Sequence, residues 1–436
     1  MTLLRRPSTT PTNPFQRLAQ TSTSRRAFLS ALAASGAAAA LAGCSTAGGG
    51  GNGAGGGQRL SYFAWDNQQT SQPVLELWKK QNPDIAIDFS NAPPVAEYIA
   101  ALQTRVLSGT AADVFCIAAE NKTNLINGGA VTDLTGKPYM SGINKLNAAT
   151  YGRDGKPYGM STASWGAGIA YNRTLLQQVG ADGVPETWED FLALCAELKA
   201  AGVTPYIEAV TGPSLVVAGF LGAQNAAQGG RMDADIFDGT STFEKQWTEP
   251  LTQWLRLWGE GYATRDAVGI TGDQSRDEFA QGRAAMTVLG PWDVPTLRSS
   301  AADLDFSLAR IPALAGGSTF LAGAASPGYA INAKSDNAEL ADSFLTFMAS
   351  PDVVKIQNTQ FAAITTTADY EPTVDPALEV VAQGVRAGEI YLPQIAWTRA
   401  EDKLNETGIA QAQLLVQGSQ TPQGMAAEMD RTLASA

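Results

Sequence analysis

The stretch RLSYFAWDNQQTSQPVLELWKKQNPDIAIDFS, residues 59–90, decides the fold of this chain. Its first eight residues have an apolar, aromatic-rich strand pattern that ends in a polar turn. Val74, Leu75 and Trp78 then recur at the spacing of one helix face, and IAIDFS (85–90) has the pattern of a second strand. A strand, a helix and a strand in this order are typical of a parallel sheet flanked by helices.

The alternation of strands and helices continues beyond residue 90. Apolar residues again share a helix face in EYIAALQTRVLSGT (97–110), Gly109 marks the end of that helix, and ADVFCIAA (112–119) is an apolar run of the buried-strand type. Parallel sheets of this kind bind ligands beyond the carboxyl ends of their strands. The polar residues that follow the first and third strands are therefore expected to share one rim: Asp66, Asn67, Glu120 and Asn121.

A second alternating section begins at WGAGIAYNR (165–173). Thr187 is placed as a helix N-cap, and RDEFAQGRAAMTVLGPWDV (276–294) has the pattern of a helix, a short strand and a turn that carries Trp292. The tryptophans at helical spacing in EKQWTEPLTQWLRLW (244–258) are expected in the core. About 380 residues follow the glycine-rich run after Cys44, which is more than one core usually serves, so two lobes are expected.

The composition excludes several classes of function. Histidine is absent, which excludes Ser-His-Asp and Cys-His catalysis and histidine-bearing zinc sites. No metal or other cofactor is expected, because the calcium-loop match that begins at DADIFDG (233–239) has Phe237 where a ligand is required. Cys116 and Cys195 lie in apolar segments and are expected as buried thiols, with one disulfide bridge between them as the alternative.

The charge balance also limits the partners of the chain. Five arginines precede Cys44, which leaves 25 basic against 42 acidic residues from there on and a formal net charge of −17. An acidic surface repels phosphate groups. Nucleic acid is therefore not expected as a partner.

The segment SRRAFLSALAASGAAAALAGC, which ends at Cys44, is too short and too alanine-rich for a membrane-spanning helix. Arg25 and Arg26 resemble the twin-arginine export signal, and LAGC resembles the lipobox at which bacterial lipoproteins are cut and lipid-modified on the cysteine. We expect residues 1–43 to be a cleaved signal peptide. A lipid on Cys44 then needs slack before the folded part, and residues 44–57 supply it as a glycine-rich tether.

Seven segments, in this order, resemble extracellular solute-binding protein family 1, the sugar-binding lipoproteins of bacterial ABC importers. They are YFAWD, GTAADVF, DGKPYGMSTASWGAGIAYNR, PETWEDFLALCAELKAAGVTP, FAQGRAAMTVLGPWD, FLAGAASPGYAINAKS and ELADSFLTFMAS. The resemblance implies a two-lobed α/β fold of the periplasmic-binding-protein type, with a mainly parallel sheet flanked by helices in each lobe, a hinge, and a ligand cleft between the lobes. The implied lobes comprise 58–162 with 312–362 and 163–311 with 370–436, and the implied crossings lie near 161–164, 311–317 and 361–369.

The resemblance also implies what the chain does. A protein similar to this family captures a sugar or oligosaccharide and delivers it to the permease subunits of an ABC transporter, without a chemical reaction. It is expected to act as a monomer on the outer face of the cytoplasmic membrane, held there by the lipid on Cys44.

Sugar chemistry suggests which residues bind the ligand. A pyranose has a flat C–H face that lies on an aromatic ring, and its hydroxyls need both donors and acceptors, so tryptophan next to carboxylates and amides is typical of such sites. On this chemistry and on the resemblance together, the expected ligand-binding residues are Trp65, Asp66, Asn67, Glu120, Asn121, Trp165, Ser214, Trp292, Asp293, Gly323 and Trp397.

Other interpretations of the same residues remain open at this point. Glu120, Asp66 and Asp293 are acids that a glycan-degrading enzyme with two catalytic carboxylates would use. Another small solute, such as a polyamine, an amino acid or a phosphodiester, is an alternative ligand, although acids without an arginine argue against anions, and the role of a sensor lipoprotein is a further alternative. Each tryptophan also has a structural alternative as a lid on its own core, and Glu120 and Asp66 have one as helix caps.

Overall fold

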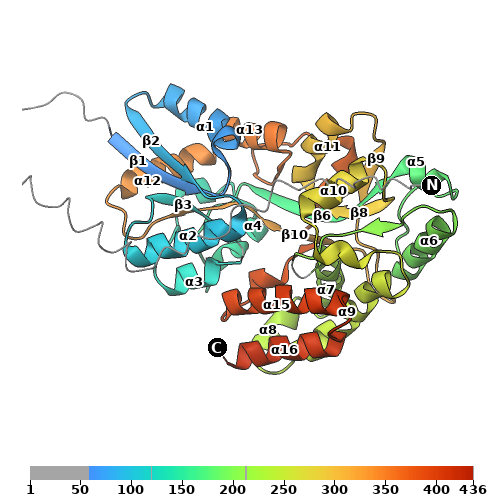
Figure 1. The fold of residues 1–436 in the computed structure, drawn as a ribbon. Coiled ribbons are helices and arrows are strands. Elements are labelled where there is room, and N and C mark those ends of the chain that lie inside the picture. Colours follow the sequence, from blue (N-terminus) through green and yellow to red (C-terminus); the bar gives the residue numbers. More distant parts are fainter. Residues whose placement is uncertain (1–57, 119, 212–213, 436) are drawn as a thin grey trace, which may run out of the picture. The chain divides into compact units, whose positions relative to one another are not determined.

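The computed structural model describes residues 58–118, 120–211 and 214–435 (Figure 1). The predicted signal peptide, tether and lipid site at Cys44 lie outside these residues, as do Ala119, Gly212 and Pro213. Within the described part, no helix has both the length and the apolar character that a membrane span requires. Cys116 and Cys195 are separate buried thiols, so the alternative of a disulfide bridge is wrong.

The smaller sheet has the strand order β11-β3-β1-β2. Its strands are β1 (Gln58–Ala64), β2 (Ile85–Asn91), β3 (Val114–Ile117) and β11 (Gly328–Ile331). β1 pairs in parallel with β2 and β3, as the pattern of residues 59–90 predicts, and β11 is antiparallel to β3. The alternation of strand and helix therefore gives the correct fold class for this lobe.

Helices cover both faces of the smaller sheet because neighbouring residues of β1 point to opposite faces. Tyr62 contacts Phe344 of α12 (Ala338–Met348), with ring centroids 5.2 Å apart, and Phe344 also contacts Trp78 of α1 (Gln68–Gln81). Phe63 contacts Tyr98 of α2 (Val95–Ser108) on the other face, at 4.5 Å. Gly109 ends α2 in the left-handed conformation (φ 72°), as expected. α13 (Pro351–Phe361) packs against α1 and α12 on their side of the sheet.

The larger sheet has the strand order β13-β10-β6-β8-β7, and β9 and β12 also pair with β6. β6 (Ala163–Asn172) is the long central strand. The others are β7 (Tyr206–Ile207), β8 (Met286–Leu289), β9 (Phe306–Ala309), β10 (Leu321–Ala325), β12 (Ile364–Thr365) and β13 (Ile390–Tyr391). All four strands that pair with β6 are antiparallel to it, and β13 and β7 run parallel to β10 and β8, so β6 is the one described strand of this sheet that runs against the others. The prediction of a mainly parallel sheet is therefore correct for both sheets, with β11 and β6 as the reversed strands. β6 enters this lobe directly from the first crossing, without a preceding helix of its own, and so runs against its neighbours.

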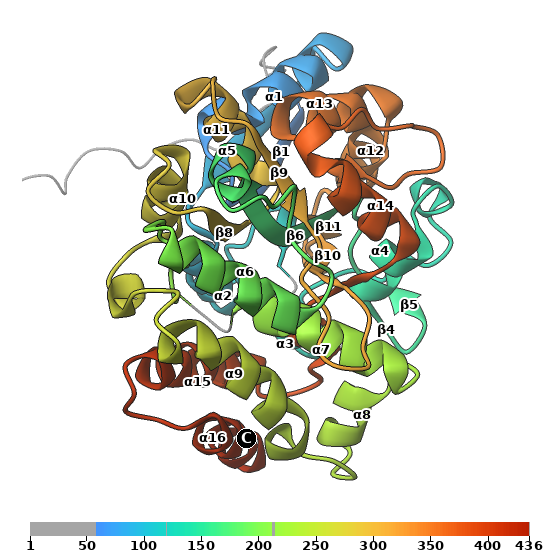
Figure 2. The same cartoon turned by 90° about the vertical axis from the view of Figure 1, so that its right-hand side faces the viewer.

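Helices enclose the larger sheet, and the predicted core tryptophans lie among them. α9 (Phe243–Gly259) buries Trp247, Trp254 and Trp258, as its sequence predicts. Figure 2 shows α9 side by side with α15 (Glu401–Val416) and α16 (Pro422–Ala434). The remaining α-helices of the described chain are α3 (Lys122–Asn127), α4 (Lys145–Thr150), α5 (Arg173–Gln177), α6 (Trp188–Ala200), α7 (Leu215–Ala227), α8 (Met232–Phe237), α10 (Gly272–Ala280), α11 (Val294–Ser300) and α14 (Glu379–Ala387).

Within the described residues, three segments pass between the two sheets and lie side by side at Ser164. Ser164 is the pairing partner of both Ala325 in β10 and Ile364 in β12. The fully buried side chain of Asn147 joins the first and third of them, because its Nδ2 donates to the carbonyls of Ser161 and Ala163 and to Oγ1 of Thr366, at 2.9–3.2 Å. Its Oδ1 accepts a hydrogen bond from the Ser164 hydroxyl at 2.8 Å.

The middle crossing lies later in the chain than the sequence predicts. Ile311 bridges Phe320, and β10 belongs to the larger sheet, so residues 311–317 do not leave that lobe. The chain changes sheets at Ser326 and Pro327, between β10 and β11. The expected start of the second lobe-1 segment at residue 312 is therefore wrong. The small side chains of LAGAA pair closely with β6 and keep this strand in the larger sheet.

Candidate functional site

The turn between β1 and α1 carries three of the predicted site residues. Asn67 caps α1, and its Oδ1 accepts hydrogen bonds from the backbone N–H (2.9 Å) and the hydroxyl (3.1 Å) of Thr70. Trp65 packs edge-on against Tyr98, with ring centroids 5.4 Å apart. Burial raises the pKa of Asp66 above its usual value. Asn67 therefore shapes the turn, whereas Trp65 and Asp66 face a cavity.

The turn after β8 carries the second pair of predicted residues. Trp292 is 52 % exposed and contacts Trp165 edge-on, with ring centroids 5.3 Å apart. Asp293 is buried, and its Oδ2 accepts the backbone N–H of Gly290 at 3.2 Å. Burial raises the pKa of Asp293 to about 6, although Arg276 lies 3.7 Å away. Asp293 thus holds the turn that presents Trp292.

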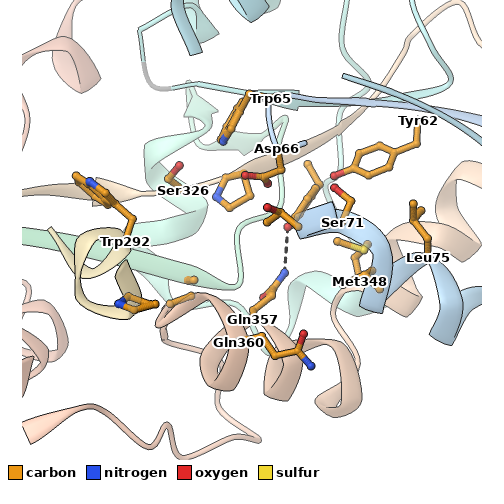
Figure 3. A pocket seen from close by; sticks show the side chains of 17 residues that line it. Tyr62, Trp65, Asp66, Ser71, Leu75, Trp292, Ser326, Met348, Gln357 and Gln360 are labelled. Carbon is orange, nitrogen blue, oxygen red and sulfur yellow. Dashed lines mark hydrogen bonds between the residues drawn. The ribbon is translucent and has the colours of Figure 1, made fainter. Parts of the chain in front are cut away.

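A cavity of about 410 Å³ lies between Trp65 and Asp66 of the smaller-sheet lobe and Trp292 of the larger-sheet lobe (Figure 3). Its volume is in the range of small-molecule sites. Figure 3 shows the two indoles toward one end, Tyr62, Leu75 and Met348 toward the other, and Asp66 between them. The full lining comprises Tyr62, Trp65, Asp66, Thr70, Ser71, Val74, Leu75, Ala163, Trp292, Pro295, Ser326, Pro327, Tyr329, Met348, Gln357, Gln360 and Ala363.

Sequence reasoning missed several polar residues of this cavity. Tyr329 lies in β11, and Gln357 and Gln360 lie on α13. The sequence carries a signal for Tyr329 as a site residue, because Tyr329 follows a Ser-Pro-Gly turn that comes directly after the segment containing Gly323. The two glutamines had none, because a polar helix face is usually solvent-exposed.

Glu120 and Asn121, expected at the same rim, follow β3 but do not line this cavity. Asn121 is fully buried, and its Oδ1 accepts the backbone N–H of Ala118 at 3.1 Å, so it holds its own loop. Glu120 is half-buried, and burial raises the pKa of its carboxyl.

Three further predicted residues have structural roles. Ser214 is buried and caps α7, where its hydroxyl donates to Glu208 and accepts from the backbone of Val216. Gly323 lies in β10, and a Cβ there would come within 2.3 Å of the backbone oxygen of Trp165. Trp165 itself is half-buried and supports Trp292 rather than lining the cavity.

Trp397 does not reach the cavity. Its side chain is 1 % exposed and lies in the core of the larger-sheet lobe, edge-on to Phe243 at 6.2 Å. An indole buried on both faces offers no surface to a ligand, so its assignment as a ligand contact is wrong. The indole packs instead among the apolar residues of α8 and α9.

Polar contacts also join the two lobes at α3. The backbone N–H of Thr123 donates to Glu401 at 3.2 Å, and Asp402 Oδ2 accepts from the side-chain amides of Asn124 (2.8 Å) and Gln103 (2.9 Å). Burial raises the pKa of the Glu401 carboxyl to about 8. The lobes thus touch at α15 as well as at the three crossings.

Comparison with known proteins gives consistent results. A family model described as bacterial extracellular solute-binding protein matches residues 64–355, which is more than half of the chain. The "Multiple sugar-binding protein" of Streptococcus mutans is 26 % identical over 290 residues, covering 64 % of this chain and 68 % of that protein. The "Galactooligosaccharide-binding protein" of Bacillus subtilis is 21 % identical over 389 residues, covering 83 % and 88 %.

Solved structures also resemble the fold. The structure of a family 1 extracellular solute-binding protein from Bifidobacterium longum subsp. infantis superposes with a TM-score of 0.74 at 29 % identity. The match covers 88 % of this chain and all of that one.

Proposed function

This chain belongs to the family of bacterial extracellular solute-binding proteins, and from that membership we propose that it captures a sugar or oligosaccharide and delivers it to an ABC permease. The observation that carries the proposal is a cavity bordered by indoles from both lobes, Trp65 and Trp292, with the Asp66 carboxylate next to Trp65. Indoles suit the C–H face of a pyranose, and a carboxylate accepts hydrogen bonds from its hydroxyls.

The names of two relatives support the same ligand class, because one is a multiple sugar-binding protein and the other a galactooligosaccharide-binding protein. Capture is expected to proceed by closure of the lobes. The contacts to Trp65 and Trp292 form together only when the lobes approach, so a ligand shifts the population toward the closed state. The partners in this proposal are the permease subunits, and the protein acts as a monomer.

The cavity supports binding without catalysis. Glycoside hydrolysis by the usual route needs two carboxyl groups that flank the scissile bond. Among the described residues that line the cavity, Asp66 is the only acid. Asp293 is bound to its own turn, and Glu120 does not line the cavity. The enzyme alternative therefore lacks its second group here.

A panel of mono-, di- and trisaccharides, including raffinose and galactobiose, tests the proposal by thermal unfolding. A saccharide that binds the folded state at about 100 times its Kd is expected to stabilise the protein by about 2.7 kcal/mol. Its radius of gyration in solution scattering is expected to fall on binding, and mass spectrometry is expected to recover the saccharide unchanged. A rise in unfolding temperature with amino acids or polyamines but with no saccharide contradicts the proposal, as does steady cleavage of the saccharide.

We further propose that the protein is anchored by a lipid on Cys44 after export through the twin-arginine route, which the sequence around Arg25 and Arg26 supports. The variant Cys44→Ala is expected to move the protein from the membrane fraction to the soluble fraction. Cys195→Ala is the matched control, because that thiol is buried in the core, and it is expected to stay with the membrane. Membrane association that survives Cys44→Ala overturns the anchor.

A further inference from the structure

Three buried side chains connect a crossing segment to the cavity. Thr162 is fully buried and immediately precedes β6. Gln357 lies on α13 and Tyr329 in β11, and each of these two side chains is 5 % exposed. The hydroxyl of Thr162 donates to Gln357 Oε1 at 2.6 Å, and Gln357 Nε2 donates to the phenol oxygen of Tyr329 at 3.0 Å. The dashed line in Figure 3 marks the second bond. We call these three residues the Thr162–Gln357–Tyr329 chain.

The direction of these hydrogen bonds fixes the chemistry of Tyr329. Because Thr162 occupies the carbonyl oxygen of the Gln357 amide, the amide presents its N–H to the phenol. The phenol oxygen then accepts, and its own hydrogen finds no acceptor within the described part of the protein. Backbone bonds in both directions between Tyr329 and Met160, at 2.7 and 2.9 Å, hold the residue in place.

The surroundings keep the phenol of Tyr329 neutral, and the Asp66 carboxylate, an acceptor group, lines the same cavity. Burial raises the pKa of Tyr329 well above the usual value, and the charge of Asp66 raises it further. Both residues line the cavity. The cavity thus offers a donor, the phenol, and an acceptor, the carboxylate, to the same ligand.

We propose that Gln357 is a positioning residue that keeps the Tyr329 hydroxyl a donor to a ligand oxygen, and that Thr162 ties this donor to the crossing between the lobes. The inference rests on the proposed sugar-binding function. A sugar oxygen accepts the phenol hydrogen while a neighbouring hydroxyl donates to Asp66. An ammonium ligand satisfies Asp66 but has no lone pair for Tyr329, so the pair selects neutral polyols over amines.

The variant Gln357→Glu tests the role of the amide because it keeps the shape and removes the donor. The new carboxylate still accepts from Thr162, and its other oxygen accepts the phenol hydrogen, which is then lost to the ligand. The affinity for the saccharide with the largest thermal shift is expected to fall about tenfold, as in Tyr329→Phe. The two changes combined are expected to cost no more than either alone.

Matched variants separate this effect from a general loss of packing. Tyr139→Phe is the control in the same lobe, because the Tyr139 hydroxyl donates to Asp342 at 2.9 Å and Tyr139 does not line the cavity, and its affinity is expected to stay within twofold of the parent. Thr162→Val is expected to weaken binding and Thr162→Ser to restore it. Losses that add up in the Gln357→Glu, Tyr329→Phe double variant, or unchanged affinity in Gln357→Glu, overturn the proposal.

A measurement without ligand distinguishes failure of this inference from failure of the proposed function. In protein labelled with ¹³C at the tyrosine Cζ, the Tyr329 resonance, identified by its loss in Tyr329→Phe, is expected to move in Gln357→Glu and in Thr162→Val. An unmoved resonance overturns the chain of hydrogen bonds, whatever the saccharide panel shows. A resonance that moves in a protein that binds no saccharide supports the chain and overturns the sugar-binding function. A resonance that moves with no change in saccharide affinity overturns the selection of ligand by Tyr329.

Discussion

Replacing Trp292 by alanine is expected to lower the affinity for the bound saccharide by roughly 100-fold, or about 2.7 kcal/mol. Trp292 is 52 % exposed, borders the cavity and is supported from behind by Trp165. Large aromatic side chains of this kind carry much of the energy at binding sites. Because the indole is not part of the core, its loss is expected to leave the unfolding temperature of the unliganded protein nearly unchanged.

Isothermal titration with the saccharide that gives the largest thermal shift measures this loss. Trp292→Phe is expected to recover part of the affinity, because a smaller aromatic face remains. Leu107→Ala is the surface control, since Leu107 is 88 % exposed at the end of α2 and does not line the cavity. Binding by Trp292→Ala within threefold of the parent protein contradicts the role of the indole.

The second large effect is expected at Gly323, where alanine should lower the free energy of unfolding by about 3 kcal/mol or more. Its Cβ would lie 2.3 Å from the backbone oxygen of Trp165 and 3.0 Å from the Cβ of Ile390. Neither contact is relieved by a rotamer change, because the nearest atom belongs to the backbone of β6. The strands must separate, and Trp165 must move with them. The folded fraction is therefore also expected to bind saccharide more weakly.

Urea unfolding of Gly323→Ala and Gly259→Ala gives a matched comparison. Gly259 lies in α9 with no atom within 4 Å of the added Cβ, so alanine there is expected to be neutral or to stabilise by up to about 1 kcal/mol. Equal urea midpoints for Gly323→Ala and the parent protein contradict the close approach of β10 to β6.

Local patterns predict the parts of the fold that depend on near neighbours in sequence. The stretch 59–90 predicts β1, α1 and β2, and the tryptophan spacing in α9 predicts its buried face. Thr187 is the N-cap of α6, as expected, and accepts from the backbone of Asp190 at 3.2 Å. Caps, turns and periodicity involve only a few consecutive residues, so the sequence states them directly.

Long-range pairing decides the rest. No local signal says which sheet a strand joins. The sequence therefore does not predict the antiparallel partners of β6 or the crossing at Ser326 and Pro327. The same holds for the site. Trp65 and Trp292 follow strands and have a chemical signature, whereas Gln357 gains its role from Thr162, 195 positions earlier in the chain. Trp397 has the signature too, but the core of its lobe encloses it.

The three crossing segments that meet at Ser164 limit how the protein moves. Strands that are hydrogen-bonded side by side resist sliding and twisting, but they bend together. Any opening of the cavity must therefore flex all three at once, around an axis close to Asn147. We therefore expect the lobes to move mainly about one axis, so that closure brings the two indoles back to a similar separation each time.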